Sequence, residues 1–435
     1  MNMKEFARRR KQLMRMIGEG SVAILPAAPV AIRNRDVDYT YRQDSDFQYL
    51  SGFPEPEAVI VLIPGRKHGE YILFCRERDM EMETWNGKRA GQAGACEIYG
   101  ADDSFPINDI DDILPGMIEG SERVFSNMGA HPEFDQHVLQ WVNKIRSMSR
   151  SGSRAPGEFV SLEYLLHDMR LYKSRAEIAL HKKAMNVSVL AHKAAMSITE
   201  PGLMEYEVEA EILYHFNTHG MQTAYSSIVG SGENGCILHY TENRAELQDG
   251  DLILIDAGAE MECYAADITR TFPVNGEFSK AQKALYEVVL DAQTAAIDKV
   301  RPGNHWNESH LAAVEVLTEG LVSLGILKGK VKKLIKEEAY RRFYMHRTGH
   351  WLGMDVHDVG DYKVGNEWRE LEPGMLLTVE PGLYIPAGSK GVAKKWWNTG
   401  IRIEDDVLVT RDDPKVLTAA APKTVDEIQD WMAQS

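Results

Sequence analysis

Apolar residues recur along the chain at two spacings, one typical of strands and the other of helices. The short apolar runs Ala58 to Ile63 and Tyr71 to Phe74 have the length of buried strands. The pattern near residues 3 to 17 is helical. From Ser174, the expected N-cap, to Ile198 the spacing predicts an amphipathic helix, followed by a second helix from about Met204 to Thr218. The chain is therefore predicted to be a mixed α/β protein.

A polar segment rich in Ser and Gly interrupts this pattern at residues 148 to 158. Such a composition is typical of a connection between domains. A chain of 435 residues is also longer than one hydrophobic core usually serves. We therefore expect a mixed α/β amino-terminal domain over residues 1–165 and a second domain over residues 166–435.

The second domain contains an approximate internal repeat. The segment LQDGDLILID at 247–256 matches LEPGMLLTVE at 371–380, with Leu, Gly, Leu and a terminal acid at the same offsets. Each copy has the pattern of a turn, a buried strand and then a carboxylate, Asp256 or Glu380. A further strand-like run carrying another acid, Asp267 or Glu404, follows each copy. Two copies of one unit predict a pseudo-twofold domain with its site on the axis.

The spacing of the first copy indicates that its two acids meet. A hairpin centred at 261.5, the midpoint of residues 256 and 267, places Asp256 directly opposite Asp267. Opposed side chains have Cβ atoms about 4.5–5.5 Å apart, and two carboxylates that close need a cation between them. The second copy is expected to give Glu380 and Glu404 the same relation across a longer excursion, although the sequence does not fix that register. A single acid beside a Gly turn is more often an N-cap or a solvated residue, but two acid pairs in corresponding positions favour a metal site.

The donor types indicate the class of metal. Four carboxylates and the imidazole of His350, with no thiolate, favour a hard ion such as Mn²⁺ over a structural Zn²⁺. Co²⁺, Fe²⁺ or Zn²⁺ could substitute. Two such divalent ions are expected as cofactors.

Charge and targeting features narrow the class of partner. The chain has 49 Lys and Arg against 65 Asp and Glu, and a net charge of -16 repels nucleic acid and anionic membranes. The basic start is not followed by a signal-peptide core, and the apolar run at 22–32 is interrupted by Pro26 and Pro29. The four cysteines lack metal-ligand or disulfide-framework spacing. We expect a cytoplasmic protein with no nucleic-acid or membrane partner.

The chemistry-bearing stretches resemble the metallopeptidase family of aminopeptidase P (Xaa-Pro aminopeptidase), prolidase and methionine aminopeptidase. In order they are IVGSGENGCILHYTENR (228–244), LILIDAGAEMECYAADITRTFPVNG (252–276), HWLGMDVHDVG (350–360), LEPGMLLTVEPGLYIP (371–386) and GIRIEDDVLV (400–409). The stretch YRQDSDFQYLSGFPEPEAVIVLIPG (41–65) is similar to the extra domain of bacterial aminopeptidase P. The resemblance implies an α/β (α+β) chain, in which a mixed α/β domain precedes a pseudo-twofold pita-bread catalytic domain. It also implies release of the N-terminal residue from peptides with proline second.

Roles for single residues come from the same resemblance. One metal is expected on Asp256, Asp267 and Glu404, and the other on Asp267, His350, Glu380 and Glu404, so that Asp267 and Glu404 bridge. The residues expected to act in catalysis are His239, His357, Glu380, His346 and Arg402. Among them, Arg402 is expected to orient a ligand carboxylate and Glu380 to act as proton shuttle. The residues expected to bind substrate are Trp85, Tyr225, His346, Val356 and Arg402. Taken alone, each of these histidines would more often be structural.

Trp85 has two interpretations. In the first, it closes the substrate groove, and in a homo-oligomer (dimer or tetramer) this is the groove of a neighbouring subunit. In the second, it is a core aromatic. A departure from the family pattern lies at Arg347-Thr348-Gly349, where close bacterial relatives are expected to carry Gly-Leu-Ser. It leaves the metal ligands intact but affects the lining of the proline pocket.

Three alternatives share the fold. A prolidase is restricted to Xaa-Pro dipeptides and is the close alternative. A creatinase-like amidinohydrolase lacks the metal ligands, and an inactive pita-bread protein used as a binding module typically has them substituted. All five ligand positions are filled here, which favours the two peptidases.

Overall fold

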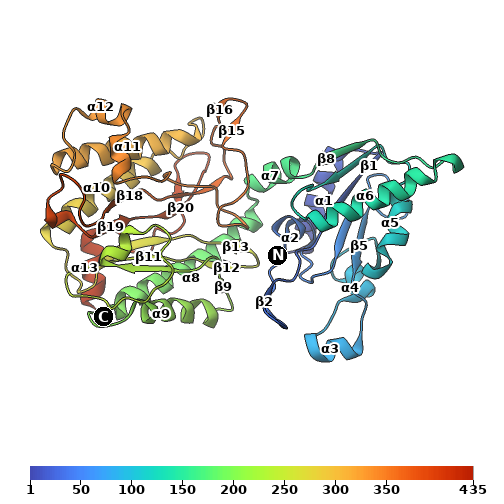
Figure 1. Cartoon of the computed structure of the whole chain (residues 1–435), viewed down its shortest axis with the longest axis horizontal. Helices are drawn as coiled ribbons and strands as arrows, with labels where there is room; N and C mark the ends of the chain where they lie inside the picture. The colour runs from blue at the N-terminus through green and yellow to red at the C-terminus, as the bar shows by residue number, and fades with distance from the viewer. Residues whose placement is uncertain (435) are drawn as a thin grey trace. The chain divides into compact units, whose positions relative to one another are not determined.

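The computed structural model describes residues 1–434, which divide into two compact units, Met1–Met169 and a second that begins at Arg170. Each unit is built around its own strands (Figure 1). Both contain helices and strands, so the predicted α/β class is confirmed. Among the described residues no helix is long and apolar enough to cross a membrane.

The first unit is built on one mixed sheet of six strands in the order β6-β5-β4-β1-β7-β8. Strand β1 pairs antiparallel with β4 and parallel with β7. The runs predicted as buried strands form β4 and β5, which are buried throughout. The strands are β1 (Ser21–Pro26), β4 (Val59–Leu62), β5 (Tyr71–Cys75), β6 (Asp103–Pro106), β7 (Arg123–Ser126) and β8 (Glu158–Ser161).

Helices cover this sheet, and a two-stranded hairpin lies apart from it. The predicted helix at 3–17 is confirmed as α1, which buries Phe6, Leu13 and Ile17. The polar segment 148–158 leads into β8 at the sheet edge. The remaining elements are α2 (Ser45–Ser51), α3 (Met80–Asn86), α4 (Gly91–Glu97), α5 (Ile110–Ile118), α6 (Pro132–Ser147), β2 (Ile32–Asn34) and β3 (Val37–Asp38), after α1 (Met3–Ile17).

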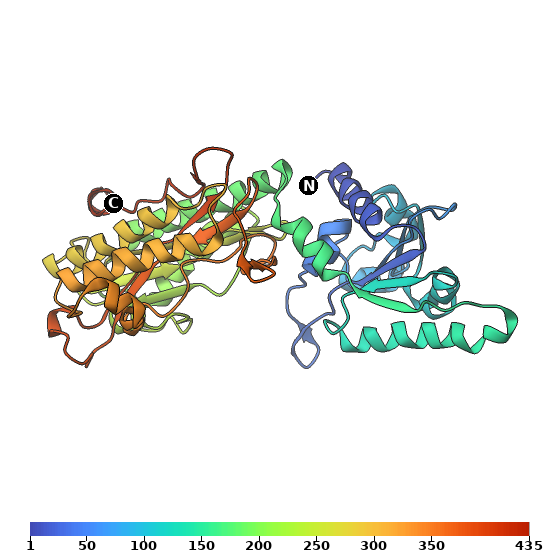
Figure 2. The same ribbon diagram turned by 90° about the horizontal axis from the view of Figure 1, so that it is seen from above.

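The second unit contains two helix pairs and several small sheets. Helix α8 begins after Ser174, whose side chain and that of Glu177 form a reciprocal capping box, as the sequence predicts. Figure 1 shows α8 and α9 along one side of the strands and α10 and α11 along the other, and in Figure 2 α10 and α11 again run side by side. The helices are α7 (Glu163–Leu171), which crosses the unit boundary, α8 (Arg175–Ile198), α9 (Glu205–Thr218), α10 (Lys280–Ile297), α11 (Trp306–Ser323), α12 (Val331–Lys336) and α13 (Val425–Ala433).

The two sequence repeats occupy corresponding places in this unit. Pair α8–α9 precedes the sheet β10-β11-β14, and pair α10–α11 precedes the sheets β17-β20-β21 and β18-β19. One apolar core joins residues of both copies, such as Ile253 and Leu377. The strands are β10 (Ile228–Ser231), β11 (Leu252–Asp256), β14 (Thr269–Pro273), β17 (Leu376–Val379), β18 (Gly382–Ile385), β19 (Thr399–Arg402), β20 (Asp405–Leu408) and β21 (Lys415–Val416).

The register of the first copy differs from the prediction. Asp256 pairs with Thr269, not with Asp267. The hairpin turns at Glu262 and Cys263, both with positive φ, so its centre lies one residue later than predicted. This turn joins β12 (Ala259–Met261) to β13 (Tyr264–Ala265). Because side chains alternate between faces, Asp267, two positions from Thr269, still lies on the face of Asp256, as a diagonal neighbour.

The second copy has the direct opposition that was predicted for the first. Strands β17 and β20 pair Val379 with Asp405, and β18 and β19 pair Gly382 with Arg402. Both pairs follow one register, and in that register Glu380 stands opposite Glu404. The four acids thus come from strand ends in both copies.

Candidate metal centre

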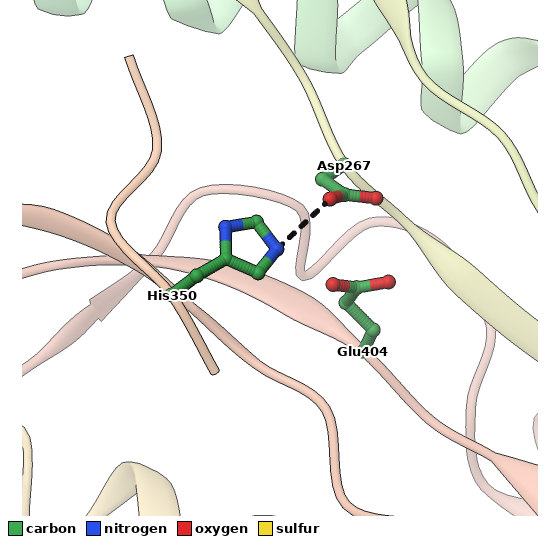
Figure 3. Close-up of side chains that lie close together, drawn as sticks. All are labelled: Asp267, His350 and Glu404. Carbon is green, nitrogen blue, oxygen red and sulfur yellow. Dashed lines mark ion pairs between the residues drawn. The ribbon is translucent and has the colours of Figure 1, made fainter. Parts of the chain in front are cut away.

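Three of the predicted ligands form the nucleus of the site. Asp267, His350 and Glu404 each offer a ligand atom, and these atoms all lie within 4.8 Å of one another (Figure 3). His350 Nε2 lies 3.3 Å from Asp267 Oδ2 and 3.5 Å from Glu380 Oε1. Asp267 and Glu404 are only 5% and 1% exposed. Four of the five predicted ligands are therefore neighbours in a site withdrawn from water.

The fifth predicted ligand, Asp256, joins this group through Tyr225. The Tyr225 hydroxyl oxygen is 2.6 Å from Asp256 Oδ1 and 2.5 Å from Asp267 Oδ1. A phenol has one proton, so it can donate to only one of the two carboxylates at a time. Burial raises the pKa of Tyr225 well above its usual value, and the charges of Asp256 and Asp267 raise it further.

Arg402 holds the other oxygen of Asp256. Its Nη2 donates to Asp256 Oδ2 at 2.6 Å, and its Nη1 and Nε donate to Tyr384 Oη and Thr269 Oγ1 at 3.0 and 3.1 Å. Thr269 in turn donates to Glu404 Oε2 at 2.7 Å. Arg402 is only 3% exposed, so its side chain is fixed by these bonds. This buried chain of contacts links acids from the two sequence repeats.

Crowding of the carboxylates shifts their protonation. Burial raises the pKa of Glu404 well above its usual value, and the neighbouring Asp267 adds to the shift. Burial also raises the pKa of Glu380 to about 7, against the opposing charge of His350. For Asp267 burial acts in the same direction, but the hydrogen bond and charge of His350, the Tyr225 hydroxyl and the charge of Arg402 together outweigh it, so the pKa of Asp267 is lowered. Without further positive charge, some of these carboxylates would be protonated and therefore neutral.

The tautomer of His350 is set by its backbone partner. His350 Nδ1 lies 2.9 Å from the carbonyl oxygen of Trp351, which can only accept, so Nδ1 carries the proton that it donates. In the neutral ring Nε2 then has its lone pair directed at the acids, as metal-binding histidines require. Burial alone would lower the pKa of His350, but Asp267 and Glu380 raise it to about 9.

The donor set therefore fits divalent ions. Four carboxylates face one guanidinium and one imidazole, and the imidazole presents a lone pair when neutral. Buried charges need pairing or a metal, and the protonated alternative leaves several acids sharing protons. Oxygen-rich sets with one imidazole suit Mn²⁺ and related ions.

Three further histidines lie around this centre. The ring of His357 makes an edge-to-face contact with His350, with centroids 4.4 Å apart, and it is exposed to solvent. His346 Nδ1 donates to the carbonyl of Arg347 at 2.7 Å, so its Nε2 accepts from the Tyr384 hydroxyl at 2.9 Å. His239 is exposed and lies near enough for its charge to act on both His346 and His357. All three predicted histidines thus border the metal centre.

The remaining predicted substrate residues lie in two places. Val356 is half-buried and packs against a small apolar cluster that includes Leu352 and Ala265. Trp85 belongs to α3 of the first unit and is 79% exposed. Its interpretation as a core aromatic is therefore wrong.

The sequence interpretation missed several residues that support the ligands. Thr269 and Tyr384 are fully buried and join Arg402 to Glu404 and to His346. Asp406 accepts a hydrogen bond from the backbone N–H of Asp267 at 3.1 Å. Thr269 and Asp406 lie two residues after the predicted ligands Asp267 and Glu404. Because side chains two residues apart in a strand lie on the same face, this spacing could have identified them from the sequence.

Comparison with known proteins gives one consistent result. The chain matches the family described as "Metallopeptidase family M24" over residues 179–411, and "Aminopeptidase P, N-terminal domain" over residues 6–125. Xaa-Pro aminopeptidase from Escherichia coli K12 is 46% identical over 99% of this chain and 97% of its own, and that of Haemophilus influenzae is 42% identical over 99% and 97%.

Solved structures agree over the whole length. The aminopeptidase PepP of Pseudomonas aeruginosa is 62% identical with a TM-score of 0.99, covering 100% of this chain and 98% of its own. Proline aminopeptidase P II of Yersinia pestis is 46% identical with a TM-score of 0.97, covering 100% of both chains. Zinc-substituted E. coli aminopeptidase P in complex with product is 45% identical, also with a TM-score of 0.97, covering 100% and 99%.

Proposed function

Because the chain belongs to metallopeptidase family M24 and carries the aminopeptidase P amino-terminal domain, we propose that its buried acid cluster holds two divalent ions and cleaves peptides after the first residue when proline is second. The chain is a Xaa-Pro aminopeptidase, a metal-dependent hydrolase, like the relatives that it matches end to end. This function holds over the prolidase alternative.

The observation that carries the proposal is the convergence of Asp267, His350 and Glu404 within 4.8 Å in a buried site. Asp256, Asp267 and Glu404 are proposed to hold one ion, and Asp267, His350, Glu380 and Glu404 the other. Mn²⁺ is favoured, because four carboxylates and one imidazole form an oxygen-rich donor set. The complete ligand set also disfavours a creatinase-like enzyme and an inactive binding protein.

When bound, two such ions lower the pKa of a water molecule and polarise the carbonyl that it attacks. The chain supplies the groups around that chemistry. Glu380 is proposed to take a proton from water and pass it towards the proline nitrogen. Burial raises its pKa to about 7 in the metal-free cluster, and a bound ion would lower that pKa again. His239 and His357 are proposed to donate hydrogen bonds to the developing oxyanion.

Arg402 is proposed to orient Asp256, one of the carboxylates assigned to the metal ions. Its bond to Asp256 Oδ2 fixes this carboxylate with Oδ1 directed at the Tyr225 hydroxyl, which also contacts Asp267. Tyr225 and Val356 are proposed to line the substrate site, together with His346 and Arg402. An Xaa-Pro bond has no N–H and a fixed φ, which is why a dedicated site is needed.

The first unit is proposed to restrict the substrate through Trp85, whose indole is 79% exposed. Met80 of the same helix is 77% exposed, and exposed apolar side chains grouped on one helix are suited to cover a peptide or a second subunit. We propose a homo-oligomer, dimer or tetramer. A cytoplasmic location is supported by cysteines that lack the spacing of a disulfide framework.

Steady-state kinetics on peptides of two lengths tests this function. The purified protein, reloaded with Mn²⁺ after chelation, should cleave Xaa-Pro-Yaa but not the same tripeptide with alanine second, and the chelated protein should cleave neither. A higher kcat/KM for the dipeptide Xaa-Pro would instead assign a prolidase. His239→Ala and His357→Ala should keep their metal content and lose on the order of 10² to 10³ in kcat/KM if they stabilise the oxyanion.

A further inference from the structure

A buried ionic cluster is centred on Asp358, the residue that follows His357 in the chain. Asp358 Oδ1 accepts from Arg170 Nη2 at 2.6 Å, and Asp358 Oδ2 accepts from Lys173 Nζ at 2.9 Å. The side chains of these three residues are 1–3% exposed. Arg170 Nη2 also donates to Asp355 Oδ2 at 2.7 Å. We refer to Asp355, Asp358, Arg170 and Lys173 as the Asp358 cluster.

A buried ionic cluster of this kind adds little net stability to a fold. Withdrawing charges from water costs about as much as their attraction returns, and apolar side chains of similar volume often stabilise a fold as well or better. Burial opposes ionisation of Asp358, yet Lys173 and Arg170 hold the pKa of that carboxyl well below its usual range. The carboxylate is therefore a permanent charge, and its contribution lies in the conformation that it fixes.

That conformation is the loop 351–358, which closes around the Asp358 carboxylate. The Asp355 N–H donates to Asp358 Oδ1 at 3.3 Å, and the Gly353 N–H donates to the Asp355 carbonyl at 3.1 Å. A Cβ on Gly353 would lie 1.9 Å from Asp358 Oδ2, so the loop packs on this carboxylate without room for a side chain. The loop conformation thus depends on where Asp358 is held.

Both His350 and His357 are connected to this loop. The Asp358 N–H donates to the carbonyl of Trp351 at 2.9 Å, and the same carbonyl accepts from His350 Nδ1 at 2.9 Å. His357 immediately precedes Asp358, is exposed, and contacts the His350 ring edge to face. An exposed imidazole with so little packing of its own takes its direction from the backbone.

We propose that Asp358, held by Arg170 and Lys173, is a positioning residue that fixes the loop 351–358 and so directs the His357 imidazole towards the substrate. The role rests on the proposed function, in which His357 contacts the reacting carbonyl. Asp358 itself touches neither substrate nor metal in this scheme, and it acts through His357.

The first test replaces Asp358 with its neutral isostere. Asp358→Asn should keep both metals and a KM close to the parent value while kcat falls on the order of 10-fold to 100-fold, the usual range for residues that orient a site from behind. A crystal structure of the variant should show the His357 ring displaced from its edge-to-face contact. The matched control is Asp361→Asn, an exposed acid three residues later, which should behave as the parent does.

A double-mutant cycle separates positioning from a general structural effect. If Asp358 acts through His357, Asp358→Asn should cost nothing further in the His357→Ala background. An equal loss of kcat in both backgrounds, or an unmoved His357 ring in the crystal structure of Asp358→Asn, would overturn the proposal. A His357→Ala variant with parent activity would instead refute the proposed function of His357, and the crystal structure would still decide whether Asp358 positions the loop.

Lys173→Met provides a milder variant in case Asp358→Asn does not fold. It removes one cation and retains the bond from Arg170 to Asp358. We expect a smaller fall in kcat with the same dependence on His357. Parent kcat in Lys173→Met, with an unmoved loop, would contradict the proposal.

Discussion

Carboxylates outnumber cationic side chains at the metal centre, and this imbalance governs each residue there. Asp256, Asp267, Glu380 and Glu404 converge on a site whose nearest permanent cation is Arg402, bonded to only one of them. Burial raises the pKa of Glu404 and of Glu380. Divalent ions would replace the protons that these shifts retain, so metal binding and proton release are linked.

That linkage predicts how pH changes the effect of metal on stability. The pKa of His350 is raised from 6.5 to about 9 and that of Glu380 from 4.5 to about 7. A raised pKa stabilises the folded state fully below the unfolded value, and this stability is lost as pH rises through the folded value. The metal-free protein should therefore lose stability between pH 4.5 and 9. The lowered pKa of Asp267 acts only at more acidic pH.

Thermal unfolding with and without Mn²⁺ checks this prediction. The gain in Tm on adding Mn²⁺ should grow from pH 5 to pH 9, because the ligands must be deprotonated to bind. Comparing the two forms at each pH removes the contributions of groups elsewhere. A gain that is constant or shrinks over this range would show that these residues do not bind the metal.

The bridging acids make a second prediction at the scale of single residues. Asp267→Ala or Glu404→Ala should abolish activity and lower the metal content to one ion or none, because each is assigned to both ions. His350→Ala should empty one site and leave the other filled. Metal content is measured by elemental analysis of the purified variants. Full occupancy in either bridging variant would contradict the assignment.

The strands that carry these acids set their geometry more finely than sequence spacing could. The hairpin of the first copy turns at Glu262 and Cys263 with φ of 50° and 66°. Two-residue turns with two positive φ values are usually Asn-Gly or Asp-Gly, and this turn lacks that signal. The register was therefore predicted one residue early at its centre, although the face shared by Asp256 and Asp267 was predicted correctly because it depends only on alternation.

Patterns of apolar spacing were sufficient to predict several of the helices and strands. The helices that begin after Ser174 and Met204 and the strands at 59–62 and 71–75 follow from periodicity and capping. The contacts of Tyr384 and Asp358 could not be predicted, because they join segments more than a hundred residues apart or depend on side-chain direction. No local pattern encodes such contacts.

One glycine at an element boundary should matter to the metal centre. Gly349 precedes His350, and a Cβ there would lie 2.0 Å from the carbonyl oxygen of Thr378 in β17. His350 and Thr378 also exchange hydrogen bonds at 3.0 and 3.1 Å. Gly349→Ala should therefore separate His350 from Glu380, lower stability by about 1–3 kcal/mol or more, and reduce metal content.

The control for this variant is Gly116→Ala, where no atom lies within 4 Å of the added Cβ. Alanine is favoured over glycine inside a helix, and Gly116 lies in α5. Denaturant unfolding and metal analysis compare the two. Parent stability and full metal content in Gly349→Ala would show that the hydrogen bonds between His350 and Thr378 do not fix His350.

On the scale of the whole chain, every proposed ligand lies in the second unit and Trp85 lies in the first. The metal centre should therefore tolerate changes in the first unit that affect substrate. Trp85→Ala should raise KM for Xaa-Pro-Yaa and leave metal content unchanged. Size-exclusion chromatography with light scattering should show an oligomer whose disruption impairs turnover. A fully active monomer, with Trp85→Ala equal to the parent, would leave the first unit a structural role only.

Anomalous scattering from crystals loaded with Mn²⁺ tests the central claim most directly. Data collected at the manganese edge should show two peaks, one bordered by Asp256, Asp267 and Glu404 and the other by Asp267, His350, Glu380 and Glu404, at ligand distances of about 2.0–2.6 Å. A single peak, or peaks that lie away from these residues, would contradict the two-metal centre.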